Sequence, residues 1–415
     1  MKVSDRDFLR SFARVGLLSF GGPAAQISLM QTELVERRGW LDQRQFLGAL
    51  SFCMLMPGPE AMQLATYAGW KLRGTLGGLI TGLLFVLPGA AVIAALALAY
   101  AEWGEVPLVQ ALFSGIKAAV LVIVTQALWR LAGRALEGRA HWALAIMAFA
   151  AIYVGALPFP VIIAAAALWG AWTSRGATPE PPPHASPGQT ARTLRTALIW
   201  AALWAAPVLA AYWAGATFLT DIALFFSKLA VVTFGGAYAV LAYMTQTVTQ
   251  THGWLSTDQM IDALGLAETT PGPLILVTQF VAMLAGFTTG GTGMALLAGA
   301  LALWVTFVPC FLWIFTGAPY LDRILAQPRL RGALAAISAA VVGVIANLSL
   351  WFALHVLFGQ IASTPFGAVP VLSSLSWTAA GLTALAALLM AALRIPMLPA
   401  LALMALTGAA AHWWT

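Results

Sequence analysis

The sequence predicts an all-α integral membrane protein that consists of two homologous repeats with inverted topology. Charged residues make up 9% of the 415 residues and hydrophobic residues 61%, and the mean hydropathy is +0.86. Soluble domains carry roughly 25% charged residues, so this chain has too few of them to hydrate a globular surface. Its apolar runs of about 20 residues fit membrane-spanning helices rather than the alternating strands of a barrel. Disordered, fibrous and ordinary cytosolic enzyme classes are therefore excluded.

The residue types that carry catalysis, metal binding or nucleic-acid binding form no pattern in the sequence. The sequence pI is about 9.6, but excess Arg and Lys in a membrane protein is typical of cytoplasmic loops. The two cysteines have no CxxC spacing, and the five histidines are scattered along the chain. There is no ATP-binding P-loop and no nucleophile–base constellation. We therefore expect no enzymatic activity, no cofactor, no metal and no nucleic-acid partner.

Nine apolar segments have the composition of membrane spans. They are 76–101, 107–129, 142–156, 159–172, 197–214, 291–315, 334–358, 369–393 and 396–413. Between the fourth and the fifth lies 174–195, which contains five prolines and is expected to be a non-helical aqueous linker. Arginines gather in this linker and in the loops after 107–129 and 291–315. Placing them inside makes the N-terminus cytoplasmic and the C-terminus periplasmic.

Three short motifs recur at one constant separation and indicate an internal repeat. Each second copy follows the first by the same interval, as from Gly21 to Gly235 (235 − 21 = 214). The pairs are Phe20-Gly21-Gly22 with Phe234-Gly235-Gly236, Gly39-Trp40-Leu41 with Gly253-Trp254-Leu255, and Pro57-Gly58-Pro59 with Pro271-Gly272-Pro273. We therefore expect one repeat over 1–173 and a second over 196–415, which carries one extra linking span.

The number of spans between the two copies predicts their relative orientation. Five spans separate the first copy from the second, and an odd number of crossings inverts the second copy. If each copy also contributes a hairpin of two spans, the chain has about 13 transmembrane segments. Inverted repeats are the common architecture of secondary transporters, with the substrate site near the middle of the membrane.

The Gly-Gly and Pro-Gly-Pro motifs are expected to break helices inside apolar sequence. Around a buried cavity, such breaks expose helix N-termini whose free N–H groups suit an anion. The alternative is that the prolines are kinks that only shape packing. The candidate substrate-binding residues at these breaks are Ser19, Gly21, Gly22, Pro57, Gly58, Pro59, Thr233, Gly235, Gly236, Pro271, Gly272 and Pro273.

Three basic residues complete the candidate substrate site. Arg14 and Lys228 occupy the same repeat position, five residues ahead of Ser19 and Thr233. Lys117 lies about ten residues into its span. A basic residue in an apolar helix is costly and usually functional, although each of the three has the alternative of extending to the membrane interface.

Two carboxylates are candidates for ion coupling. Glu60 follows the first Pro-Gly-Pro motif, and Glu268 precedes the second by three residues. They are expected to carry a coupling proton. The alternatives are an ion pair with Arg14 or Lys228, or a favourable charge of Glu60 at a helix N-terminus.

Together, the repeated motifs resemble those of the chromate ion transporter (CHR) family in its long, two-domain form. The resemblance covers both halves of the chain outside the linker, with Ala237 in the second copy where the first has Pro23. It implies a bacterial inner-membrane transporter that exports chromate by alternating access and gives chromate resistance. Its expected partners are chromate and the lipid bilayer; a second copy in a homodimer is a further candidate that no residue pattern indicates. Sulfate is an alternative substrate, and a proton-coupled importer of sulfate or another oxyanion and an anion channel remain alternative functions.

Overall fold

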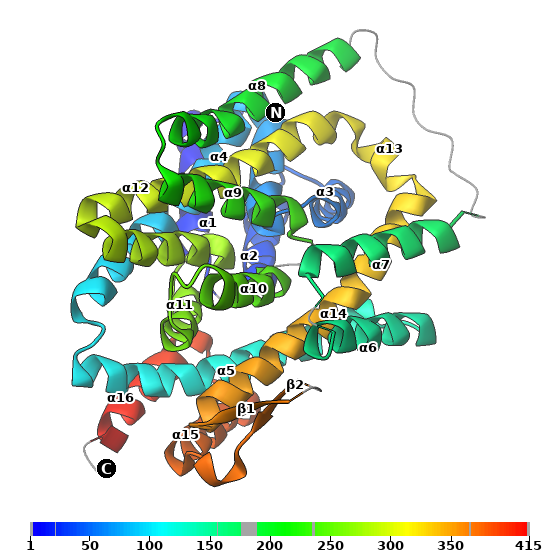
Figure 1. The fold of residues 1–415 in the computed structure, drawn as a ribbon. Coiled ribbons are helices and arrows are strands. Elements are labelled where there is room, and N and C mark those ends of the chain that lie inside the picture. Colours follow the sequence, from blue (N-terminus) through cyan, green and yellow to red (C-terminus); the bar gives the residue numbers. More distant parts are fainter. Residues whose placement is uncertain are drawn as a thin grey trace. The chain divides into compact units, whose positions relative to one another are not determined.

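The computed structural model describes residues 3–20, 22–155, 157–175, 189–234, 237–364 and 367–412, and these are mainly helical (Figure 1). Five helical segments in this part of the chain are long and apolar enough to cross a membrane. They are Glu60–Trp103, Pro107–Ala135, Thr190–Trp213, Leu274–Leu325 and Pro328–Leu357. Shorter apolar helices accompany them. The all-α membrane class is thus confirmed, whereas the count of about 13 crossings stays a prediction.

The chain forms two compact units, and each unit draws segments from both predicted repeats. Unit 1 comprises Met1–Leu98, Ala171–Ala237 and Thr270–Gly332. Unit 2 comprises Ala99–Gly170, Tyr238–Thr269 and Ala333–Thr415. The division of the sequence into two repeats joined by a linker stays a prediction.

Unit 1 contains the segments that carry most of the repeated motifs. Its elements are α1 (Asp5–Leu17), α2 (Gly22–Gln31), η1 (Thr32–Arg37), α3 (Gln43–Leu55), most of α4 (Glu60–Trp103), α8 (Gln189–Trp213), α9 (Thr217–Val232), η3 (Leu274–Leu276), α12 (Val277–Gly317), η4 (Ala318–Tyr320) and α13 (Leu321–Leu325). Helix α12 packs against α8 and α9. The Trp200 ring stacks on Phe311, and the Trp304 indole donates to the Leu203 carbonyl at 2.8 Å.

Unit 2 contains the remaining long helices and a short hairpin. Its elements are α5 (Pro107–Ala135), α6 (Arg139–Tyr153), most of α7 (Phe159–Thr173), most of α10 (Ala237–Gln246), η2 (Thr247–Thr251), α11 (Thr257–Thr269), most of α14 (Pro328–Leu357), β1 (Ile361–Thr364), β2 (Gly367–Pro370), η5 (Leu372–Ser374), α15 (Trp377–Ala387), η6 (Leu388–Ala392) and α16 (Met397–His412). Strands β1 and β2 pair antiparallel, with Ile361 opposite Pro370.

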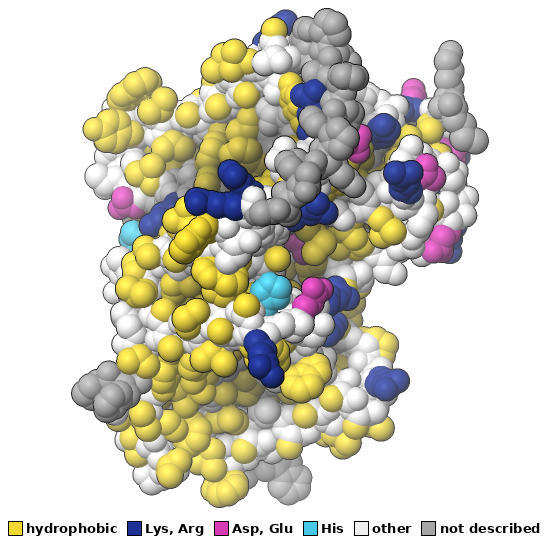
Figure 2. Space-filling model, turned by 90° about the vertical axis from the view of Figure 1, so that its right-hand side faces the viewer, with side chains coloured by type: hydrophobic (Ala, Val, Ile, Leu, Met, Phe, Trp, Pro, Cys, Tyr) yellow, Lys and Arg dark blue, Asp and Glu magenta, His cyan; other side chains and the backbone are white. Residues whose placement is uncertain are grey.

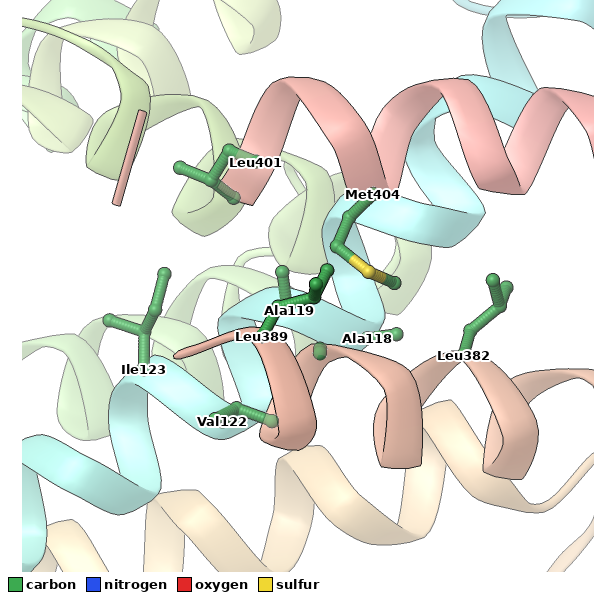
Figure 3. Close-up of a cluster of buried hydrophobic side chains, with 9 residues drawn as sticks. Ala118, Ala119, Val122, Ile123, Leu382, Leu389, Leu401 and Met404 are labelled. Atoms are coloured by element: carbon green, nitrogen blue, oxygen red, sulfur yellow. The ribbon is translucent and has the colours of Figure 1, made fainter. Parts of the chain in front are cut away.

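Helix α5 packs closely between α15 and α16 in unit 2. Ala118, Ala119 and Val122 of α5 meet Leu382 and Met404 in a buried apolar cluster (Figure 3). A side chain at Gly115 would collide with the Met404 carbonyl, so the backbones of α5 and α16 are in contact there. This packing fixes the position of α5 within unit 2.

Helices α4 and α12 each consist of two helical segments joined at a glycine. Gly74 has φ of +68° and Gly291 has φ of +69°, and both have ψ of −161°. Only glycine adopts this region readily. The same kink therefore occurs in equivalent long helices of the two sequence halves.

Two sequence predictions of helical extent are wrong. Helix α8 begins at Gln189, so the last seven residues of the expected linker are helical, because all of its prolines precede that position. The expected span 369–393 becomes α-helical only at Trp377. Its first residues belong to strand β2 and the short 3-10 helix η5, because Pro370 cannot continue an α-helix and the Ser376 side chain caps α15.

The surface is rich in apolar side chains. Hydrophobic side chains cover much of the face in Figure 2, with Lys and Arg side chains scattered among them. Large exposed examples include Trp129, which is 83% accessible, and Trp377, which is 80% accessible. Such a surface is stable in lipid rather than in water, in agreement with the long apolar helices.

Candidate functional site

The repeated motifs interrupt helices, as predicted. Helix α1 ends at Leu17 and α2 begins at Gly22, while α9 ends at Val232 and α10 begins at Ala237. The Pro-Gly-Pro motifs separate α3 from α4 and α11 from η3. The helices are therefore interrupted four times, at sequence positions that the repeat relates in pairs.

The two kinds of break are joined by a reciprocal pair of hydrogen bonds in unit 1. The Gly58 backbone N–H donates to the Thr233 carbonyl at 2.8 Å, and the Gly272 N–H donates to the Ser19 carbonyl at 2.8 Å. Gly58 and Gly272 are repeat equivalents, and so are Ser19 and Thr233. Each Pro-Gly-Pro motif thus binds the Gly-Gly break of the other half, which is the pattern that a local twofold relation produces.

Both hydroxyl side chains at the breaks are buried and already engaged. Ser19 donates to the Val15 carbonyl at 2.5 Å, and Thr233 donates to the Leu229 carbonyl at 2.6 Å. These are bonds from residue i to residue i−4 at the end of α1 and α9. In this conformation the two hydroxyl groups can accept hydrogen bonds, but their protons are used within their own helices.

Glutamines complete the polar surroundings of the breaks. The Gln26 amide donates to the Gly272 carbonyl at 2.7 Å and to the Ser19 carbonyl at 3.2 Å. The Gln63 amide donates to the Pro57 carbonyl at 2.6 Å, and the Gln63 Oε1 atom is buried with no hydrogen-bond partner among the described residues. Sequence reasoning missed Gln26 because its repeat equivalent is Val240, so repeat comparison carries no signal there.

The Pro-Gly-Pro turns require glycine. Gly58 has φ of +118°, and a Cβ atom there would lie 2.9 Å from both Cys310 Sγ and Gln63 Nε2. Gly272 has φ of +90°, and a side chain at Gly89 would collide with the Pro271 carbonyl. The backbone can therefore approach its neighbours at both turns only without side chains.

The remaining predicted residues of unit 1 lie around this centre with different exposure. Pro57, Pro59, Pro271 and Pro273 belong to the two turns, and all but Pro57 are buried. Gly22 begins α2, and Glu60 begins α4 with its side chain partly buried. Arg14 and Lys228 are exposed on α1 and α9. Gly21, Gly235 and Gly236 lie outside the described residues.

Two predicted residues belong to unit 2. Lys117 lies within 3.3 Å of Asp258 and of Asp262. The buried Glu268 side chain accepts a hydrogen bond from the Tyr238 hydroxyl at 2.8 Å. Lys117 is therefore paired with carboxylates in this conformation, a feature that sequence spacing did not indicate.

A charge network at the start of unit 1 was also not predicted from the sequence. Glu33 is buried and accepts from the Ser11 hydroxyl at 3.1 Å and from Arg38 Nε at 3.3 Å. Burial by itself raises the pKa of Glu33, but the hydrogen bonds from Arg38 and Ser11 outweigh it and hold the pKa below its usual value. The Glu33 carboxylate is thus the ionised centre that links α1 to η1.

Comparison with known proteins identifies the family. The family model described as "Chromate transporter" matches residues 6–171 and 220–411, well over half of the chain, and its two matched segments flank the predicted linker. The chain belongs to the chromate transporter family. This confirms the resemblance seen in the repeated motifs, and it makes the chain a membrane transport protein rather than an enzyme.

Curated relatives in the chromate transporter family match most of the chain. It is 32% identical to the "Chromate transport protein" of Pseudomonas aeruginosa, over 80% of this chain and 77% of that protein. It is 28% identical to the "Chromate transport protein" of Cupriavidus metallidurans, over 82% of this chain and 80% of that protein. No solved structure matches the chain significantly. Family membership and the apolar helices together support a multi-pass membrane location.

Proposed function

We propose that this chain exports chromate from the cytoplasm across the bacterial inner membrane, with its N-terminus cytoplasmic and its C-terminus periplasmic. Two relatives of similar length are chromate transport proteins by name. The reciprocal hydrogen bonds between the Gly-Gly and Pro-Gly-Pro breaks carry the proposal, because transporters bind substrate where broken helices of inverted repeats meet.

The reciprocal hydrogen bonds support a mechanism of alternating access. Two backbone bonds, Gly58 to Thr233 and Gly272 to Ser19, hold the two halves at equivalent points. If the repeats are inverted, rocking one half against the other around this contact exchanges an inward-open state for an outward-open one. Within unit 1, the N–H groups at the starts of α2 and α4 supply donors for an oxyanion.

The membrane potential favours export over uptake. Moving a dianion outward runs down an inside-negative potential and releases about 4.6 kcal/mol per 100 mV. Export then needs only a selective site with two access states, whereas import would need that free energy from a coupled ion. Sulfate has the same charge and tetrahedral shape, so it is the natural competitor.

Chromate accumulation in energised cells tests this proposal. Cells that express the chain should accumulate less labelled chromate than cells that lack it, and collapse of the membrane potential should remove the difference. Sulfate in excess should reduce the effect if the two anions share the site. Higher accumulation, or an effect on sulfate alone, would contradict chromate export and favour a proton-coupled oxyanion importer. A current that does not saturate with concentration would indicate a channel.

A further inference from the structure

Unit 2 contains a cluster of four titratable side chains, of which only Lys117 was among the predicted substrate-binding residues. Tyr100 comes from the end of α4, Lys117 from α5, and Asp258 and Asp262 from α11. Asp258 and Asp262 are one helical turn apart, so both carboxylates point towards the same side of α11. We call these four residues the Lys117 cluster.

The ammonium group of Lys117 lies within ion-pair distance of two carboxylates in the Lys117 cluster. Lys117 Nζ donates a hydrogen bond to Asp258 Oδ1 at 3.3 Å. It also lies 3.3 Å from Asp262 Oδ1, but without hydrogen-bond geometry. Asp262 Oδ1 is therefore buried with no hydrogen-bond partner within the described ranges. The other oxygen, Oδ2, accepts from the Tyr100 hydroxyl at 2.7 Å.

The two carboxylates differ strongly in their access to solvent. The Asp258 side chain is 82% exposed, whereas the Asp262 side chain is 8% exposed. Lys117, between them, is 21% exposed. With both carboxylates ionised the three charges sum to minus one. Water can stabilise the charge of the exposed Asp258. The buried Asp262 lacks this stabilisation, so its ionised state is the costly one.

The packing of unit 2 keeps Lys117 next to α11. Helix α5 is held by α15 and α16, and the apolar cluster in Figure 3 begins at Ala118, the residue after Lys117. The flexible part of the cluster is therefore the lysine side chain, which can turn between Asp258 and Asp262 while the helix stays in place. Tyr100 is steadied by an edge contact with the Phe113 ring at 5.3 Å between centroids.

The fold itself does not require these charges. The repeat equivalent of α11 is α3, which has the same length of 13 residues. At the positions of Asp258 and Asp262, α3 carries Arg44 and Gly48. A helix of this kind therefore forms in the first half without a buried carboxylate, which favours a function for Asp262 over a purely structural one.

We propose that Asp262 binds one proton in each transport cycle and that Lys117 exchanges its pairing between Asp262 and Asp258 as the proton comes and goes. The proposal rests on the proposed chromate transport and adds a coupled ion to it. When the Asp262 carboxylate takes up a proton, it becomes a neutral acid that still accepts from Tyr100, and Lys117 pairs with Asp258 alone. When the proton leaves, Lys117 compensates the Asp262 charge. The proton enters the cell as the anion leaves.

The proton site is distinct from the carboxylates that the sequence suggested. The groups that face Asp262 are Lys117 from α5, Asp258 from α11 itself and Tyr100 from α4. Glu105, between α4 and α5, adds a further negative charge near Tyr100. Glu268, the sequence-predicted candidate on α11, has the Tyr238 hydroxyl as its partner.

Infrared spectroscopy tests the proton site without any transport. The purified full-length protein in lipid is titrated with acid, and the carbonyl stretch of protonated carboxyl groups is followed. We expect one component of this band to disappear in Asp262→Asn and to persist in Glu36→Gln, which removes an exposed carboxylate outside the Lys117 cluster. In Tyr100→Phe its titration midpoint should move to higher pH, because this variant lacks the hydrogen bond that stabilises the ionised carboxylate. An unchanged band in Asp262→Asn would overturn the assignment.

Chromate flux in proteoliposomes at a fixed membrane potential tests the coupling. With one proton exchanged per anion, the steady-state chromate ratio should shift about tenfold for each unit of imposed pH difference. Asp262→Asn should still move chromate but show no such shift, and the exposed control variant Glu36→Gln should keep it. A normal shift in Asp262→Asn, or dependence on a sodium gradient instead, would refute the proton site. If the unmodified chain moves no chromate, the proposed function fails. The infrared experiment still shows whether Asp262 binds a proton.

Discussion

The backbone N–H of Gly58 donates to the carbonyl of Thr233, 175 positions later in the sequence (233 − 58 = 175), at 2.8 Å. The equivalent bond from Gly272 to Ser19 has the same length. Both bonds use only main-chain atoms, so they form only where two segments of the backbone come close together. Glycine permits this close approach because it has no side chain.

Gly58→Ala is expected to destabilise the protein. The φ angle of +118° costs an L-residue about 1–2 kcal/mol, and the new Cβ atom would press on Cys310 Sγ and Gln63 Nε2. The apparent unfolding temperature in detergent should fall, and chromate resistance should fall with it. Gly48→Ala is the matched control, because Gly48 is in α3 with no atom near its Cβ position. It should stabilise the helix by up to about 1 kcal/mol, and equal effects of the two changes would contradict the assignment.

Gln26→Leu is expected to remove the side-chain bridge between the two breaks. The Gly272 carbonyl would lose the Gln26 amide, and a buried acceptor left unpaired costs about 1–3 kcal/mol. Gln31→Leu removes a longer amide contact with Gln43 in an exposed setting and should cost less than about 0.5 kcal/mol. Thermal unfolding of the two variants, followed by tryptophan fluorescence, makes the comparison. A stable Gln26→Leu variant would show that the bridge is dispensable.

Acid is expected to weaken the attachment of α1 through Glu33. The pKa of Glu33 is lower in the folded protein than its ordinary value of 4.5, so its stabilising contribution is complete above that value and is lost as the pH falls through the lower folded value. Unfolding temperatures measured from pH 7 down to pH 3 should fall more for the unmodified protein than for Glu33→Gln, and the two curves should converge in acid. Glu36→Gln, an exposed change in the same η1 segment, should follow the unmodified protein. Parallel curves for Glu33→Gln would show that Glu33 does not contribute.

Neutralising Arg14 and Lys228 together is expected to abolish chromate resistance. The two residues occupy equivalent positions five residues before Ser19 and Thr233, and a dianion needs positive charge near its path. The double variant Arg14→Gln/Lys228→Gln should remain in the membrane at normal levels, as immunoblots of membrane fractions would show. Arg10→Gln removes an exposed charge from the same helix and should keep resistance. Full resistance in the double variant would exclude the proposed role of both residues.

The parts of the fold that the sequence predicts are those determined locally. Proline and glycine act on their own stretch of backbone, so the sequence alone predicts the breaks at Pro57-Gly58-Pro59 and Pro271-Gly272-Pro273 and the repeat that relates them. Family membership follows from the same motifs. Hydropathy found the long helices but placed their ends less well, as in the strand before α15, because it does not register a single Pro370 or a capping Ser376.

The contacts between distant residues could not be predicted. Lys117 lies within ion-pair distance of Asp258 and Asp262, which are more than 140 positions away in the sequence. No rule of sequence spacing connects α5 with α11. Gln26 reaches the Gly272 carbonyl across an even longer interval, and its equivalent Val240 hides it from repeat comparison. Nor does any sequence pattern indicate that the hydroxyl protons of Ser19 and Thr233 are used within their own helices.

The main-chain nature of the Gly58–Thr233 and Gly272–Ser19 bonds has an evolutionary consequence. If the two predicted repeats arose by duplication, their side chains could diverge while these main-chain bonds were kept. Val240 in place of Gln26, Gly48 in place of Asp262 and Ala237 in place of Pro23 are such divergences. In this way the second half could acquire the proposed proton-binding Asp262 and the first half the Glu33 network, while the two main-chain bonds stayed unchanged.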